Sequence, residues 1–171
     1  EDLVDEVHAV QARVHAERAE DVGLLCQQAG LGFRYFSSMP ATLDAARVVI
    51  VDTLGDLVYL YGVATAAFVG GSLTGRGGHN PVEALLAGVP VVTGSSVSNF
   101  QAIYRALIDA GAVEMVTTEA ALADRVCVWF DDRSRRDAAV EAGLRVIAHN
   151  RGALQRNLVF LRRELAVLDP G

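Results

Sequence analysis

The sequence predicts an α/β fold, a Rossmann-like parallel sheet with helices on both faces, and three observations support this prediction. Short β-branched runs alternate with helix-like segments from Phe33 onward, as in consecutive βαβ units. The strand-like runs, such as Val48 to Val51, are continuously apolar, which indicates a sheet buried on both faces. The 171 residues, 51% hydrophobic and 21% charged, suit one globular domain. We therefore treat residues 1–171 as a single domain.

The expected elements follow one another in a regular order. We expect strands at 48–51, 67–69, 89–93 and 112–116, and helices at 57–63, 81–87, 100–110, 118–130 and over much of 134–165. Gly88 and Gly111 end two of these helices, a common role for glycine.

The first thirty residues fit this order less well. Leu3, Val7, Val10 and Val14 form one helical stripe, whereas Val22 and Leu25 are out of phase with it. The phase change near Ala16 and Glu17 predicts a kink, or two helices whose connection is missing. The strand that a doubly wound domain requires here is not visible.

Composition excludes several classes of site. All fifteen basic residues are arginine, which excludes a P-loop lysine and a Schiff-base lysine. Cys26 and Cys127 stand singly in apolar helical patterns, and the four histidines are scattered, so we expect buried free thiols and no metal site. No apolar run approaches the ~18–20 residues of a membrane span.

Charge is unevenly distributed along the chain. The net charge is −6, yet residues 133–163 hold eight arginines against Asp137 and Glu141. Such a basic segment could meet phosphates, an anionic membrane face or another domain. It could equally be a solvated helix face.

The strongest functional signal is a glycine-rich loop between a predicted strand and a predicted helix. Five glycines fall within residues 70–78, and Asn80-Pro81-Val82-Glu83 follows them. Asn80 is a good helix N-cap, Pro81 suits the first position, and Glu83 would complete a capping box. The glycine backbone and the amides of the first helical turn form a potential phosphate or diphosphate site, although Asn-Pro-x-Glu alone is also an ordinary helix start.

Two further loops follow strands at the same predicted edge, where open α/β sheets bind ligands. In the first, residues 51–57, Asp52 or Thr53 could cap the next helix, or the turn could form one wall of a base pocket. The second runs from Gly94 to Phe100. We expect the three loops to form one cleft.

The run from Val51 to Gly94, with its VDT-x-G and GGS…GGHNP-x-E motifs, closely resembles the C-terminal half of 3-deoxy-D-manno-octulosonic acid (Kdo) transferases. The resemblance extends over roughly residues 30–165. It implies one half of a GT-B glycosyltransferase, in which two Rossmann-like domains enclose the active site. It also implies transfer of Kdo from CMP-Kdo to lipid A precursor at the cytoplasmic face of the bacterial inner membrane, in lipopolysaccharide biosynthesis.

The resemblance also implies roles for individual residues. Leu54, Gly55 and Asp56 would lie near the cytosine. Gly77, Gly78, His79 and Asn80 would hold the phosphate, Glu83 would contact the ribose, and Ser72 would line the loop. His79 could alternatively be a buried packing residue. No cofactor is implied besides the donor substrate, and no nucleic-acid partner.

The sequence departs from the family pattern at several positions. Asp56 stands where glutamate is usual, Ala84 where proline is common, and Ser95-Ser96 where a Pro-His pair is usual. The family's Pro-Arg-His-Pro-Glu-Arg stretch is represented only by His15-Ala16-Glu17-Arg18, or by Glu17-Arg18 alone. The phosphate-contacting arginine of that stretch therefore cannot be placed.

The resemblance further implies that the acceptor site, the membrane contact and the acidic general base belong to an N-terminal domain absent from this sequence. We therefore expect the 171 residues to bind the donor without catalysing transfer. Two alternatives remain: the donor domain of another GT-B enzyme, such as a hexosyltransferase or UDP-sugar epimerase, and a non-catalytic nucleotide-binding domain.

Overall fold

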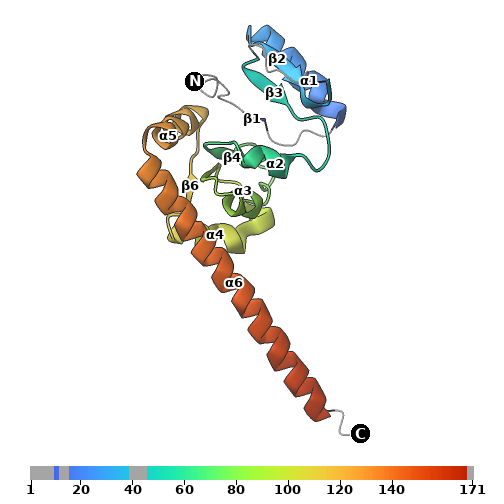
Figure 1. Cartoon of the computed structure of the whole chain (residues 1–171), viewed down its shortest axis with the longest axis vertical. Coiled ribbons are helices and arrows are strands. Elements are labelled where there is room, and N and C mark those ends of the chain that lie inside the picture. The colour runs from blue at the N-terminus through green and yellow to red at the C-terminus, as the bar shows by residue number, and fades with distance from the viewer. Residues whose placement is uncertain (1–9, 12–15, 39–45, 169–171) are drawn as a thin grey trace.

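The computed structural model describes residues 10–11, 16–38 and 46–168, and it shows an α/β fold with a long C-terminal helix (Figure 1). The strands are β1 (Val10–Gln11), β2 (Phe33–Tyr35), β3 (Val48–Ile50), β4 (Ala67–Val69), β5 (Val91–Thr93) and β6 (Val113–Met115). The α-helices are α1 (Ala16–Gln28), α2 (Leu57–Tyr61), α3 (Val82–Leu86), α4 (Gln101–Asp109), α5 (Glu119–Asp131) and α6 (Arg133–Leu168). Short 3-10 turns lie at Phe36–Ser38 and Ser98–Phe100.

All strand pairs in the described part of the chain are parallel, as the sequence predicts, but they form two sheets. One sheet has the order β1-β3-β2 and the other β4-β5-β6. The predicted α/β fold class is thus confirmed, while the single sheet is split between β3 and β4.

Helices cover both faces of the second sheet, and two neighbouring residues of β5 show it. Val91 and Val92 are both fully buried, yet they belong to different hydrophobic clusters, because successive side chains of a strand point to opposite faces. Val91 packs with Leu85 of α3 and Leu107 of α4, and Val92 packs with Trp129 of α5. This packing fixes α3, which follows the glycine loop.

The N-terminal region corrects the sequence interpretation. Val10 lies in strand β1 and pairs with Val49 of β3, so the expected helical stripe is wrong at this residue. Leu3, Val7 and Val14 lie outside the described residues. Helix α1 begins at Ala16, so the phase change marks the start of a helix after a strand. The strand that the fold requires is therefore present, as the short β1.

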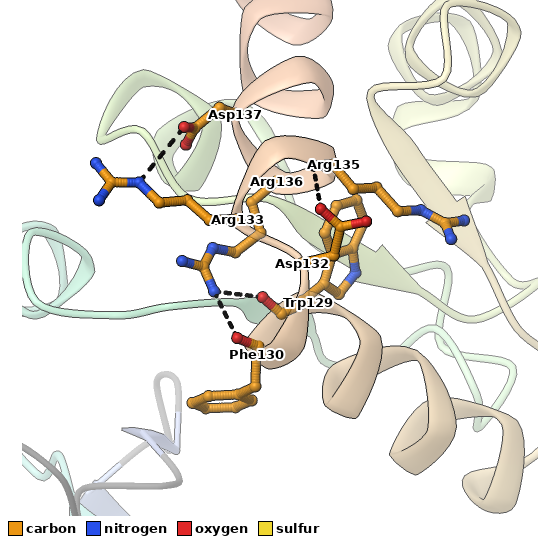
Figure 2. Close-up of polar contacts among 7 residues, drawn as sticks. All are labelled: Trp129, Phe130, Asp132, Arg133, Arg135, Arg136 and Asp137. Carbon is orange, nitrogen blue, oxygen red and sulfur yellow. Dashed lines mark hydrogen bonds and ion pairs between the residues drawn. The ribbon is translucent and has the colours of Figure 1, made fainter.

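The corner between α5 and α6 is built from arginine and aspartate side chains (Figure 2). Asp132 Oδ1 accepts from the Arg135 amide at 2.9 Å, which caps the start of α6. Arg136 Nη1 donates to the Trp129 and Phe130 carbonyls at 2.5 and 3.1 Å, which closes the end of α5. Gly143 then lets α6 pass close to α3, because a Cβ there would lie 2.9 Å from Leu85 Cδ2.

Much of the basic final segment has local partners. Arg133 and Arg145 form ion pairs one helical turn along α6, with Asp137 at 3.6 Å and Glu141 at 2.8 Å. Arg135 pairs with Glu114 at 3.0 Å and lies over the Trp129 ring. The side chains of Arg156, Arg162 and Arg163 lie outside the described ones. These contacts favour the solvated-face interpretation for the first part of α6.

Candidate functional site

The glycine loop leaves the end of β4 at Gly70 and enters α3 at Val82, and its glycines have the backbone freedom the sequence suggests. Four of them have positive φ: Gly71 at 76°, Gly75 at 73°, Gly77 at 83° and Gly78 at 66°. Residues other than glycine rarely adopt this left-handed backbone conformation, so the path of the loop requires these glycines.

Ser72 fixes the loop from inside. Its side chain is fully buried, and its Oγ donates to the Val69 carbonyl at 2.6 Å and accepts from the Gly94 amide at 2.7 Å. The Ser96 amide donates to the Ser72 carbonyl at 2.8 Å. Because its hydroxyl is already satisfied within the protein, Ser72 belongs to the framework of the site.

The loop from Gly94 to Phe100 packs directly on the glycine loop, as expected for loops that share an edge. Gly77 donates its amide to Ser96 Oγ at 3.0 Å and accepts from the Asn99 amide at 3.1 Å. Asn99 Nδ2 lies 3.2 Å from both the Arg76 and the Gly78 carbonyl oxygens. The Gly78 amide donates to the Gly71 carbonyl at 3.4 Å. The amides of Gly77 and Gly78 thus form hydrogen bonds within the protein that hold the shape of the loop.

His79 is exposed, so the alternative that it is a buried packing residue is wrong. Its Nδ1 lies 2.8 Å from the Gly70 carbonyl oxygen, and its own carbonyl accepts from the Tyr104 hydroxyl at 2.8 Å. Tyr104 of α4 is fully buried, and burial raises the pKa of its phenol to about 12. It therefore acts as a neutral donor. Sequence reasoning overlooked Tyr104, whose only signal is a tyrosine on the apolar face of helix 100–110.

The start of α3 confirms one predicted contact and corrects another. Asn80 Oδ1 accepts from the Val82 amide at 3.1 Å, so its side chain does satisfy the first amide of the helix, although α3 begins at Val82 and Pro81 occupies the N-cap position. Glu83 is exposed and forms no return hydrogen bond to Asn80 in the described structure, so the predicted capping box is wrong. Helix α3 has only five residues, so its dipole adds little, and an anion would depend on the loop and its side chains.

The turn after β3 is tied to the end of β2. Asp52 accepts from the Ser37 amide and hydroxyl, at 2.9 and 2.5 Å, and these bonds hold the pKa of Asp52 below its usual range. Thr53 Oγ1 donates to Asp56 Oδ2 at 2.5 Å. Helix α2 begins after Asp56, which makes no side-chain cap. The prediction that Asp52 or Thr53 caps this helix is therefore wrong.

Helix α2 lies against α3 (Figure 1), so the turn before α2 belongs to the same part of the molecule as the glycine loop. Tyr61 of α2 is buried, and burial together with the charge of Glu83 raises its pKa. Leu54 is 86% exposed at the tip of the turn, and Gly55 beside it has φ of 95°. Leu54 and Gly55 are therefore open to a ligand.

Arg76 is the cation of the glycine loop, and the sequence interpretation gave it no role. Its side chain is exposed and pairs with no carboxylate in the part of the chain that the structure describes. A Cβ added at Gly71 would lie 3.3 Å from His79 Cε1 and 3.6 Å from Arg76 Cβ. The His79 ring and the Arg76 stem therefore flank Gly71.

The described residues contain neither a cluster of metal-ligating side chains nor a membrane-spanning helix. No group of three metal-ligating side chains occurs among them, and none of their helices has the length and apolarity to cross a membrane. Both cysteines are free, but only Cys26 is buried. The expectation that both thiols are buried is wrong for Cys127.

Two curated sequence relatives are 3-deoxy-D-manno-octulosonic acid transferases. The chain is 37% identical to a 3-deoxy-D-manno-octulosonic acid transferase of Haemophilus influenzae over 149 residues, which are 86% of this chain and 35% of the relative. It is 32% identical to the enzyme of that name from Bordetella pertussis over 145 residues, 84% of this chain and 34% of the relative. The chain thus spans about a third of the length of these curated relatives. No family model matches the sequence.

A solved structure has the same fold. It is the C-terminal CMP-Kdo binding domain of WaaA from Acinetobacter baumannii, with a TM-score of 0.77 and 28% identity over 81% of this chain and 72% of that domain. Sequence and structure agree: this chain is a homologue of the 3-deoxy-D-manno-octulosonic acid transferases, with the fold of a C-terminal CMP-Kdo binding domain.

Proposed function

We propose that this chain is the donor-binding domain of an inverting glycosyltransferase that moves Kdo from CMP-Kdo to lipid A precursor. The observation that carries the proposal is the likeness to a CMP-Kdo binding domain, combined with a glycine loop that leaves His79 and Arg76 exposed beside Gly71. Exposed arginine and histidine side chains beside a glycine-rich loop suit a phosphate.

Each part of the nucleotide has a proposed contact. Leu54, Gly55 and Asp56 lie near the cytosine, and Glu83 accepts hydrogen bonds from the ribose hydroxyls. His79 and Asn80 hold the phosphate, and we add Arg76 to them because its guanidinium has no carboxylate partner among the described residues. Gly77, Gly78 and Ser72 act indirectly, by holding the shape of the loop.

The rest of the reaction lies outside these residues in our proposal. An N-terminal domain supplies the acceptor site, the general base and the peripheral contact with the cytoplasmic face of the inner membrane. The donor domain contributes positioning and stabilisation of the departing CMP. We propose no cofactor besides the donor substrate itself.

The test is a calorimetric titration of the purified chain with CMP, UDP and UDP-N-acetylglucosamine. We expect CMP to bind and the two uridine nucleotides to bind at least tenfold more weakly. Preference for a uridine nucleotide would support another GT-B enzyme in place of a Kdo transferase. Absence of binding to all three would refute the nucleotide site.

A further inference from the structure

His79 is held in one orientation by contacts on both sides of its Cα. Its ring Nδ1 is hydrogen-bonded to the Gly70 carbonyl oxygen at 2.8 Å. Its backbone carbonyl is held by the buried Tyr104 hydroxyl at 2.8 Å. Beneath the ring, Gly71 leaves just enough room, since a Cβ there would lie 3.3 Å from Cε1 and 3.4 Å from Nδ1. The orientation of the ring is therefore fixed before any ligand binds.

The hydrogen bond between Nδ1 and the Gly70 carbonyl determines which ring nitrogen carries a hydrogen. A carbonyl oxygen only accepts hydrogen bonds, so Nδ1 must carry a hydrogen in the neutral ring as well as in the charged one. In the neutral ring Nε2 is then a lone-pair acceptor. No side chain or carbonyl in the described structure forms a hydrogen bond with Nε2, and the residue is exposed. Nε2 is thus the atom left for a ligand.

The oxygens of a nucleotide phosphodiester are also acceptors, so the neutral ring cannot hydrogen-bond to them through Nε2. We infer that His79 binds the donor phosphate as an imidazolium, and that the site takes up one proton when a phosphodiester donor binds. This inference rests on the proposed function. It deepens that function, because CMP leaves with one more negative charge than the diester had, and a charged N–H stabilises the leaving group more than the substrate.

The charged and titratable groups around His79 are few. The charged side chains of this part of the chain are Arg76, whose Cβ flanks Gly71 with the His79 ring, and Glu83 of α3. Tyr104, below the backbone, has its pKa raised to about 12 by burial, and Tyr61 of α2 also has a raised pKa, so both stay neutral near pH 7. The facing loop, residues 94–100, contains no charged residue. The change of charge near neutral pH is therefore assigned to the imidazole.

The first test is the pH dependence of affinity for the methyl ester of CMP, a phosphodiester that keeps one charge near neutrality. Histidine side chains change charge between about pH 5 and 8, so calorimetric titrations would cover that interval and one unit above it. We expect Kd to be constant at low pH and then to rise by up to about tenfold per pH unit, the limit for uptake of one proton.

Two variants and one ligand serve as controls. His79→Gln offers an uncharged N–H at similar reach, so its Kd should be nearly independent of pH. His149→Gln removes an exposed histidine of α6 and should follow the parent chain. Cytidine, which has no phosphate, should bind with little pH dependence in every variant. A flat profile for the parent chain, or the same slope in His79→Gln, would overturn the inference while leaving the proposed function intact. Absence of binding at any pH would refute both.

A second test examines the tautomer directly. In the free protein above pH 8, long-range proton–nitrogen NMR of the imidazole, assigned by its loss in His79→Gln, should show the hydrogen on Nδ1. A neutral ring with its hydrogen on Nε2 would contradict the inference, because that tautomer can donate to a phosphate without a second proton.

Discussion

The carboxylate of Asp52 accepts two hydrogen bonds from Ser37, one from the backbone amide at 2.9 Å and one from the hydroxyl at 2.5 Å. Asp52 lies two residues after the end of β3, and Ser37 lies in the 3-10 turn that follows β2. The pair therefore joins the carboxyl ends of two neighbouring strands and anchors the turn that leads to Leu54 and Asp56. The Val-Asp-Thr motif thus has a structural role, through Asp52, in addition to the cytosine contact that we propose for the turn after it.

Asp52→Asn should lower Tm by about 1–3 °C at neutral pH, since the pair is largely solvent-accessible and its contribution is screened. The Ser37 hydroxyl and amide hold the pKa of Asp52 below its ordinary 3.8. The stability they add is therefore present above that value and lost as pH falls through the lowered pKa. Thermal melts between about pH 2 and 7 should show a smaller acid-induced loss in the variant. An identical acid limb would contradict the role of this pair.

Gly94→Ala should be severely destabilising, because the new Cβ would lie 2.4 Å from both the carbonyl carbon and the carbonyl oxygen of Ser72. These are backbone atoms, so relief requires separation of the two loops and loss of the Ser72–Gly94 hydrogen bond. We expect a loss of several kcal/mol, measured by urea unfolding.

Gly70→Ala is the matched control for Gly94→Ala. A Cβ at Gly70 meets nothing within 4 Å, and its φ is not positive. Its stability should stay within about 0.5 kcal/mol of the parent chain. Equal losses in the two variants would show that general loop strain, and not the approach of Ser72 to Gly94, decides the outcome.

The contrast between these glycines shows what sequence could predict. The strands at 67–69 and 113–115 follow from local apolar runs, so the sequence predicts them. The approach of Gly94 to Ser72 joins residues 22 positions apart, and no local pattern specifies it. Likewise Asn80 was recognisable as a cap, whereas the engagement of Gly77 by Asn99 depends on how two loops meet.

Short elements were harder to predict than long ones for a related reason. Strand β1 has two residues, Val10 and Gln11, too few for a period-two pattern, and it exists through pairing with Val49 and Ile50. Arg76 was overlooked because a single arginine in a glycine run has no spacing signal. We propose Arg76 as a phosphate contact because it is exposed and has no carboxylate partner within the described residues.

Asn99→Ala should weaken CMP binding although Asn99 is not proposed to touch the nucleotide. Its amide nitrogen holds the carbonyls of Arg76 and Gly78 at 3.2 Å, and loss of both bonds leaves the loop less ordered before binding. We expect about a three- to tenfold rise in the Kd of CMP, because ordering then has to occur on binding. Ser98→Ala, in the same loop, should leave the Kd within twofold. Unchanged affinity in Asn99→Ala would show that the loop needs no such support.

Glu83→Gln separates ribose binding from helix capping. Because Glu83 makes no capping bond in the described structure, the variant should keep its Tm within about 1–2 °C. It should nevertheless bind CMP more weakly, because a hydrogen bond to a charged acceptor contributes about 1.5–3 kcal/mol. The pKa of Tyr61, raised by burial and then by Glu83, should fall in the variant, as an ultraviolet titration of tyrosinate would show. A large drop in Tm with unchanged CMP affinity would instead show that Glu83 stabilises the fold and does not bind the ribose.

The last prediction is that these 171 residues do not transfer sugar by themselves. The chain corresponds to 35% of the length of its Haemophilus influenzae relative, so most of that relative has no counterpart here. Correct placement of donor and acceptor can supply roughly 7–11 kcal/mol of a reaction barrier. We expect a domain without the acceptor surface and the general base to lose most of that contribution while it still binds CMP. The purified chain would be incubated with freshly made CMP-Kdo and lipid A precursor, beside a full-length Kdo transferase as positive control. Turnover within tenfold of the control would show that a base and an acceptor site exist within these residues, and that the proposed division of labour between two domains is wrong.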